Sequence, residues 1–191
     1  RDCVCPSAHD NFCSHRFDRQ YGELPQGYDH KYVYSHFGYN LKVTDLQAAI
    51  GVEQLKKFPS FIECRRHNWD KLHKALECVQ DKIILPTPAE NSRPSWFGFL
   101  ISVKPETGLN RNEVTRYIEE HNIQTRLLFS GNLVKHPCFN QIRGTNAYRV
   151  IGTLDTTEYI MNNTFWIGVY PGMTDKMIDY MAKTIIEAVS Q

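Results

Sequence analysis

The segment YSHFGYNLKVTDLQAAIGVEQL, residues 34–55, contains the clearest helix start in the chain. Thr44 is followed three residues later by Gln47, which matches a capping box in which each side chain bonds the other residue's backbone N–H. We therefore predict a helix from Thr44 to about Lys57. Its AAIGV stretch is apolar on most sides of a helix, which predicts that this helix is buried.

A second, longer helix is expected after Pro59, because proline usually ends or kinks a helix. Its apolar residues recur at helical spacing, and basic residues occupy the other faces. The apolar positions are Ile62, Trp69, Leu72, Leu76 and Val79. This helix is predicted to be amphipathic and to pack on one side, with Trp69 and Trp96 as core positions.

The rest of the chain divides around these helices. Residues 1–36 show no sustained period, so we expect an arm or loop with a short extended piece at Lys31–Ser35. Residues 37–80 form a helical segment that bridges two domains. Residues 81–191 alternate short apolar runs with helix caps, which predicts a small α/β domain of the α+β type, with a small, mostly antiparallel sheet and helices on one face.

Strands and caps of this small domain can be assigned individually. Strands are expected at Ile83–Leu85, Trp96–Val103, Ile123–Leu128 and Phe165–Val169. Helix starts are expected at Asn110 with Glu113, at Asp155 with Glu158, and at Thr174.

Composition narrows the class of protein. The chain has 191 residues, of which 41% are hydrophobic and 23% charged, and it carries 22 basic and 21 acidic side chains for a net charge of +1. This balance provides no field for binding nucleic acid. No apolar run has the length of a membrane span and no signal peptide is visible, so we expect a cytoplasmic protein without a membrane partner.

Cys3, Cys5 and Cys13 have the spacing C-x-C-x7-C in a polar loop. Clustered thiolates on a loop suit an iron-sulfur cluster or zinc, whereas the alternative is three reduced, unligated cysteines. A [2Fe-2S] cluster needs four ligands, so the fourth is expected from His9, from His15 or from residues upstream of Arg1. Because the chain opens on Arg1 directly in this loop, we expect it to be a fragment. The other cysteines, Cys64, Cys78 and Cys138, are expected to be reduced thiols.

Residues 34–55 resemble the GYN-x-[RK]-x-x-[DE]-x-QAA-x-G segment of the DegT-type sugar-nucleotide aminotransferase family, which are fold-type I pyridoxal-phosphate enzymes. Residues 22–32, 94–103, 125–132 and 164–174 are similar to the branch that contains CDP-4-dehydro-6-deoxyglucose 3-dehydratase, often described as a lipopolysaccharide-biosynthesis protein. The C-x-C-x7-C loop distinguishes that branch. The resemblance extends over essentially the whole chain and implies the C-terminal portion of a longer enzyme.

The resemblance also implies an activity. Such enzymes are homodimers that use pyridoxamine phosphate to remove the C3 hydroxyl of a CDP-4-keto-6-deoxyglucose, and a [2Fe-2S] cluster passes them electrons from an NADH-dependent iron-sulfur flavin reductase. Cys3, Cys5 and Cys13 match three cluster ligands. The catalytic His, the aspartate under the pyridine nitrogen and the fourth cysteine are expected upstream of Arg1. The isolated chain is therefore expected to be inactive and to bind neither cofactor.

Three further residues match family positions. Asn40 matches an asparagine that reaches the cofactor phosphate of the neighbouring subunit, and its alternative role is that of a turn residue. Lys42 is expected to contact a phosphate or the sugar, or else to be a solvated lysine. Arg126 matches an arginine near the nucleotide-sugar end of the pocket, and its alternative role is a surface ion pair.

Two rival functions remain open at this point. A plain pyridoxal-phosphate-dependent sugar-nucleotide aminotransferase would keep the GYN segment but has no use for the cysteine loop. A non-catalytic metal-binding or interaction domain is the second alternative. Iron content separates the first rival from the dehydratase.

Overall fold

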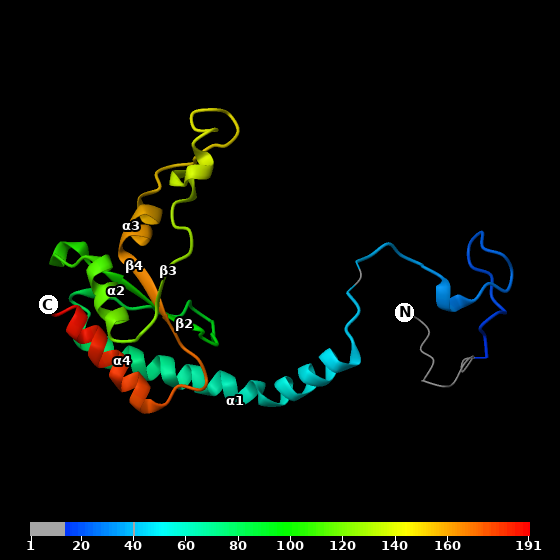
Figure 1. The fold of residues 1–191 in the computed structure, drawn as a ribbon, viewed down its shortest axis with the longest axis horizontal. Helices are drawn as coiled ribbons and strands as arrows, with labels where there is room; N and C mark the ends of the chain where they lie inside the picture. The colour runs from blue at the N-terminus through cyan, green and yellow to red at the C-terminus, as the bar shows by residue number, and fades with distance from the viewer. Residues whose placement is uncertain (1–13, 40) are drawn as a thin grey trace. The chain divides into compact units, whose positions relative to one another are not determined.

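The structure, a computed structural model, describes residues 14–39 and 41–191 (Figure 1). The chain divides into two compact units, Arg1–Ala48 and Ala49–Gln191, and each is described by itself. Within the described residues, no helix is long and apolar enough to cross a membrane. Four α-helices and four strands carry the fold of these residues, together with short 3-10 turns.

In the N-terminal unit, an ion pair holds an irregular stretch together. Arg16 donates from Nε and Nη2 to Oδ2 of Asp29, at 2.9 and 2.7 Å. Hydrogen bonding to Arg16 lowers the pKa of Asp29. Asp29 also caps the 3-10 turn η1 (His30–Tyr32) by accepting from the backbone N of Lys31. The expected extended piece at Lys31–Ser35 is therefore wrong at its start, because the capped turn includes Lys31 and Tyr32.

The first long helix confirms the predicted cap but not the predicted break. In α1 (Asp45–Leu76) the backbone N of Thr44 donates to the Gln47 side chain at 3.0 Å, and the backbone N of Gln47 donates to Thr44 Oγ1 at 3.4 Å. The helix runs through Pro59, so the two predicted helices are one. Pro59 has no N–H to donate to the carbonyl of Leu55, four residues earlier in the helix. This half of α1 is exposed, so water can bond that carbonyl instead.

The predicted burial of the first half of α1 is also wrong for this chain. Its large apolar side chains are exposed; these are Leu46, Ile50, Val52, Leu55 and Phe58. They lie on several sides of the helix, as the AAIGV pattern indicates, but no described element covers them. Only the C-terminal half of α1, from Asn68 onward, enters the core. The sequence pattern identifies the apolar side chains of this helix. Their burial also requires another element to pack against them.

The C-terminal unit contains one antiparallel sheet in the order β1-β2-β4-β3. Its strands are β1 (Ile83–Ile84), β2 (Gly98–Val103), β3 (Thr125–Leu127) and β4 (Thr164–Gly168). All four lie within or next to the predicted runs. Side chains alternate across the sheet, so one face carries the fully buried residues Phe99, Ile101, Val103, Phe165 and Ile167.

Helices cover that buried face. The core joins the C-terminal half of α1, α2 (Arg111–Glu120) and α4 (Asp175–Ala188) to the inward-facing strand residues. An aromatic stack closes one end, where Trp69 lies parallel to Trp96 with ring centroids 4.5 Å apart, and Trp69 also contacts Phe99. Helices on one face of an antiparallel sheet, and both tryptophans as packing positions, agree with the prediction.

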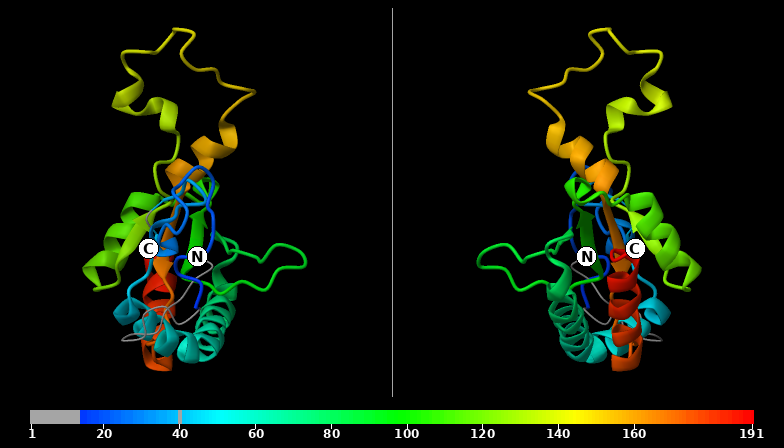
Figure 2. Two further views of the ribbon diagram at one scale, coloured as in Figure 1. Left: turned by 90° about the vertical axis from the view of Figure 1, so that its right-hand side faces the viewer. Right: turned by 90° about the vertical axis from the view of Figure 1, so that its left-hand side faces the viewer.

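Two of the three downstream caps form as predicted. Asn110 accepts from the backbone N of Asn112, and Thr174 accepts from the backbone N of Met177. The third is wrong, because α3 (Asp155–Asn163) begins at Asp155 itself and its cap residue, Leu154, makes no side-chain cap bond. Glu158 bonds a distant loop instead. The segment between β3 and α3 extends away from the sheet in both views (Figures 1 and 2).

Two phenylalanines, Phe99 in the core and Phe97 exposed just before β2, give a matched stability test. Phe99 is fully buried, so we expect Phe99→Ala to lower the free energy of unfolding in urea by about 3–5 kcal/mol. Phe97 is 60% exposed, and we expect Phe97→Ala to cost about 1 kcal/mol or less. Equal losses for the two variants would contradict the assignment of Phe99 to the core and Phe97 to the surface.

Candidate functional site

The outer face of the sheet, opposite the helices, brings Arg126 next to an aromatic ring. Arg126 on β3 is the register partner of Trp166 on β4, and Trp166 is the register partner of Leu100 on β2. These three residues form one row across the sheet. Arg126 is exposed, and its Nη1 donates to the carbonyl of Thr125 at 2.9 Å. The predicted substrate residue therefore lies on a sheet face that no described helix covers.

The start of β3 is fixed by a carboxylate. Thr125 is buried and donates to Glu119 Oε1 from its hydroxyl at 2.6 Å and from its backbone N at 3.2 Å. Hydrogen bonding to Thr125 lowers the pKa of Glu119. Because Arg126 follows Thr125 directly, this contact to α2 fixes the backbone from which the arginine extends.

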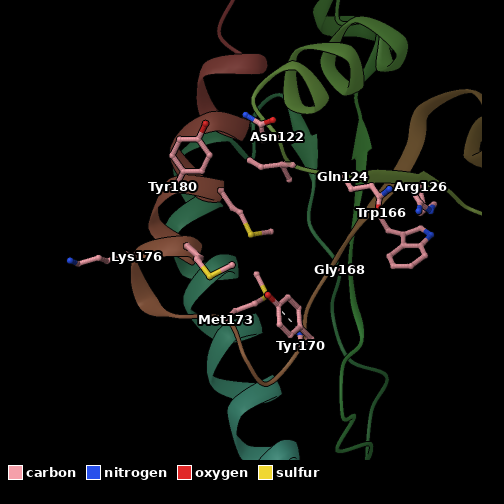
Figure 3. Close-up of a pocket in the computed structure, with 12 residues that line it drawn as sticks. Asn122, Gln124, Arg126, Trp166, Gly168, Tyr170, Met173, Lys176 and Tyr180 are labelled. Carbon is pink, nitrogen blue, oxygen red and sulfur yellow. Dashed lines mark hydrogen bonds between the residues drawn. The ribbon is translucent and has the colours of Figure 1, made fainter.

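A cavity of about 600 Å³ lies between this edge of the sheet and α4 (Figure 3). Arg126 and Trp166 lie together at one end, and Tyr180 and Lys176 extend from α4 (Figure 3). The hydroxyl of Tyr180 donates to the carbonyl of His121 at 3.1 Å, which fixes that ring. Lys176 points away from the other lining residues (Figure 3). Aromatic and thioether walls with the Arg126 guanidinium at one end suit a ligand that has a planar or apolar body and a negative charge.

A second cavity of about 420 Å³ shares Trp166 and lies along the outer face of the sheet. Its floor includes Gly98 and Leu100 of β2. The indole N–H of Trp166 donates to the carbonyl of Leu127 at 3.2 Å, which orients the ring. Sequence reasoning did not single out Trp166. The signal that identifies it is its position between two buried residues of β4, which sends its side chain to the opposite face.

The loop that follows β3 is tied to α3 by polar contacts. Asn132 is buried and donates from Nδ2 to Glu158, and Lys135 donates to the same carboxylate at 2.6 Å. Gly131 has φ of +59°, and a Cβ there would lie 2.5 Å from Met161, so this position needs glycine. The loop is therefore positioned by three side chains and one close approach.

The remaining predicted site residues are distributed differently. Cys3, Cys5, Cys13 and Asn40 lie outside the described residues. Lys42 is exposed in the irregular segment before α1, in the N-terminal unit. Over residues 14–39 and 41–191, no group of three or more His, Cys, Asp or Glu side chains is arranged to hold a metal. His15, the alternative ligand within the described residues, contacts Asp18 with 2.6 Å between Nδ1 and Oδ2.

Comparison with known proteins identifies relatives along the whole chain. A profile of the DegT/DnrJ/EryC1/StrS aminotransferase family matches residues 16–186. The chain is 49% identical over 187 residues to the lipopolysaccharide biosynthesis protein RfbH of Salmonella typhimurium, covering 98% of this chain and 42% of the relative. It is 47% identical over 191 residues to dTDP-4-dehydro-2,6-dideoxy-D-glucose 3-dehydratase of Saccharopolyspora spinosa, covering 100% of this chain and 40% of the relative. The chain spans about two-fifths of the length of these relatives.

A solved structure shows the same arrangement of elements. GDP-4-keto-6-deoxy-D-mannose-3-dehydratase of E. coli, with bound hydrated PLP, matches with a TM-score of 0.67 at 26% identity. The match covers 81% of this chain and 38% of that one. The expected fold is confirmed, because these helices and this antiparallel sheet form part of the pyridoxal-phosphate-dependent aminotransferase fold.

The contact between Glu158 and the loop after β3 gives a prediction about pH. Hydrogen bonding to Lys135, and then to Asn132, lowers the pKa of Glu158. A lowered pKa contributes stability above the unfolded value of about 4.3, and this stability is lost as the pH falls through the folded value. We expect Glu158→Gln to speed hydrogen exchange of the loop amides at pH 7, and the difference from the unmodified protein to shrink below about pH 4.

Glu113→Gln is the matched control, because the exposed Glu113 carboxylate bonds no other described residue. Loop exchange rates that are equal in Glu158→Gln and the unmodified protein at pH 7 would show that this carboxylate does not hold the loop.

Proposed function

Because this chain belongs to the DegT/DnrJ/EryC1/StrS aminotransferase family, we propose that it is the C-terminal portion of a sugar-nucleotide 3-dehydratase that acts on CDP-4-keto-6-deoxyglucose. The product would enter deoxysugar synthesis for the O-antigen of lipopolysaccharide. One observation carries the choice of branch: relatives at 49% and 47% identity are named for lipopolysaccharide biosynthesis and for a 3-dehydratase, over 98% and 100% of this chain.

The substrate class is supported by chemistry on the sheet. The Arg126 guanidinium offers planar, paired N–H groups that suit a diphosphate, and it is exposed beside an aromatic-walled cavity. We propose Arg126 as a substrate-binding residue for the nucleotide end of the sugar. The relatives differ in the nucleotide, since they are named for dTDP-linked and GDP-linked sugars. The choice of CDP is therefore a separate part of the proposal. Competition between CDP-, GDP- and dTDP-sugars in the full-length enzyme tests it.

Pyridoxamine phosphate is the proposed cofactor, and the family and its PLP-bound relative support a cofactor of this class. When bound, it supplies an amine that condenses with the sugar ketone and a ring that withdraws electrons from the neighbouring carbons. Asn40 would hold its phosphate, since an amide N–H donates to phosphate oxygens. Lys42 is proposed as a substrate-binding residue. The catalytic His is proposed to lie in the part of the enzyme upstream of Arg1, so this chain by itself would be inactive.

The cysteine loop is the proposed electron entry. Cys3, Cys5 and Cys13 would hold a [2Fe-2S] cluster together with an upstream fourth cysteine, and the cluster supplies single-electron transfer when bound. Its electron donor would be an NADH-dependent iron-sulfur flavin reductase, which makes the cytoplasm the proposed location. We also propose a homodimer, because the exposed apolar residues of α1 need cover that the described residues do not supply.

A sugar-nucleotide aminotransferase is the second candidate, and the name of the matching family favours it. It differs from the dehydratase in having no use for iron. Iron and sulfide content of the anaerobically purified full-length protein separates the two functions. Iron-free protein that transfers an amino group to the keto sugar would replace the dehydratase proposal.

The cluster role predicts a selective defect. In the full-length enzyme we expect Cys5→Ser to abolish reductase-coupled deoxygenation and to leave solvent-isotope exchange at C3 largely intact. Removing the C3 hydroxyl needs the cofactor and a base, whereas the reduction needs an electron relay. A serine oxygen is a harder and poorer iron ligand than a thiolate.

Cys64→Ser is the control, because Cys64 is a free, exposed thiol on α1 and should leave both reactions unchanged. Normal coupled turnover by Cys5→Ser would exclude the loop as the relay. Loss of isotope exchange as well would mean that the loop maintains the active-site structure.

The phosphate role of Asn40 predicts weaker cofactor retention. In the full-length enzyme we expect Asn40→Ala to weaken pyridoxamine-phosphate binding by about 1.5–3 kcal/mol, the value of a hydrogen bond to a charged group. Cofactor release is measured by absorbance after dilution, with the exposed Asn140→Ala as the control. Unchanged retention at an unchanged melting temperature would remove Asn40 from the cofactor site.

A further inference from the structure

The second cavity lies on the outer face of the sheet and is lined mainly by aromatic and aliphatic side chains. We call it the aromatic pocket, and its lining includes Phe97, Gly98, Leu100, Leu128, Phe129 and Trp166. Its volume of about 420 Å³ is in the range of small-molecule sites. Phe97 and Phe129 are 60% and 76% exposed, so their rings add little to the core of this chain.

The Trp166 ring lies close against β2 because Gly98 has no side chain. A Cβ on Gly98 would lie 2.7 Å from Cε3 of Trp166, so any other residue there would displace the indole. Phe97 meets the same ring edge-on, with centroids 5.3 Å apart. Together with the hydrogen bond from the indole N–H to Leu127, these contacts fix the ring before any ligand arrives.

Phe129 occupies a strained backbone position. Its φ is +49°, in the left-handed region that a bulky residue rarely adopts, and its backbone N donates to the carbonyl of Leu127 at 2.7 Å. Such strain persists only where surrounding structure imposes it, and it clusters at binding sites. The part of the loop that follows Phe129 is held in place, because Asn132 and Lys135 bond Glu158.

A positive charge stands beside this pocket. Arg126 is the register partner of Trp166, and its one hydrogen bond among the described residues is to the carbonyl of Thr125. No carboxylate of the described residues forms an ion pair with it. Arg126 lines the first cavity, and that cavity shares Trp166 with the aromatic pocket. A base in the pocket would therefore carry its phosphates past Trp166 toward the guanidinium.

We propose that the aromatic pocket holds the nucleobase of the nucleotide sugar by stacking, with Arg126 at the diphosphate. This inference rests on the proposed function and adds how the nucleotide is recognised. Stacking uses the face of a base, which every base has, so it tolerates different bases. Relatives named for dTDP-linked and GDP-linked sugars support a shared site of this kind. Base discrimination would then depend on other residues.

The test measures nucleotide binding and does not use turnover. Full-length protein is titrated calorimetrically with CDP, GDP and dTDP, and with inorganic pyrophosphate as the probe for the phosphate end. The variants are Phe129→Leu and Phe97→Leu, which keep an apolar side chain but remove the ring. Phe139→Leu is the matched control, because Phe139 packs edge-on against Tyr148 away from the pocket, with centroids 5.0 Å apart.

We expect each pocket variant to raise the Kd for CDP by about 5-fold or more, and the Kd values for GDP and dTDP by similar factors. The Kd for pyrophosphate should not change, and Phe139→Leu should change no Kd. Arg126→Gln should weaken pyrophosphate as well as CDP.

Nucleotide Kd values that stay unchanged in both pocket variants would overturn the stacking site and leave the proposed function standing. Variants that lose thermal stability without ligand but bind CDP normally would also overturn the stacking site. The pocket would then be a packing surface for the rest of the protein. A weakening confined to one base would overturn the tolerant stacking. Unmodified protein that binds none of the three nucleotides would instead remove the proposed function itself.

Discussion

The pairing of β2 with β4, from Gly98 opposite Gly168 to Ser102 opposite Thr164, decides what each side of the sheet can do. Because side chains alternate along a strand, this register sends Phe99 and Ile167 into the helices and sends Trp166 to the other face. A slip of one residue would exchange the two sets. The core and the outer-face site are therefore consequences of the same register, and packing against the helices also fixes where Arg126 and Trp166 lie.

The side chains on the outer face of the sheet are positioned by hydrogen bonds to helices elsewhere in the fold. Arg126 follows Thr125, which is bonded to Glu119 of α2, and Phe129 leads into a loop bonded to Glu158 of α3. Both carboxylates have a lowered pKa because hydrogen bonds favour their charged form. Site side chains are thus exposed, while the groups that position them are tied to helices. This division suits a binding face that must be open to a ligand and still hold one geometry.

The helix α1 shows which features can be predicted from local sequence and which cannot. The capping pair of Thr44 and Gln47 is local, so it was predictable and it forms. Continuation through Pro59 was not predictable from the same rules, because the cost of a missing donor depends on whether water reaches the free carbonyl. Burial of the AAIGV stretch depends on a covering surface, and the described residues do not provide one.

The sequence by itself determined the helix caps at Thr44, Asn110 and Thr174, the positions of the four strands and the family, because these depend on short-range spacing and residue type. It also placed Arg126 on a strand. Tertiary structure alone decided that Arg126 shares a row with Trp166, that Gly98 leaves room for the indole, and that Glu158 holds a loop instead of capping α3. Each of these pairs residues at least 23 positions apart, as in Lys135 and Glu158, and only the register of the sheet and the path of the loop bring such residues into contact.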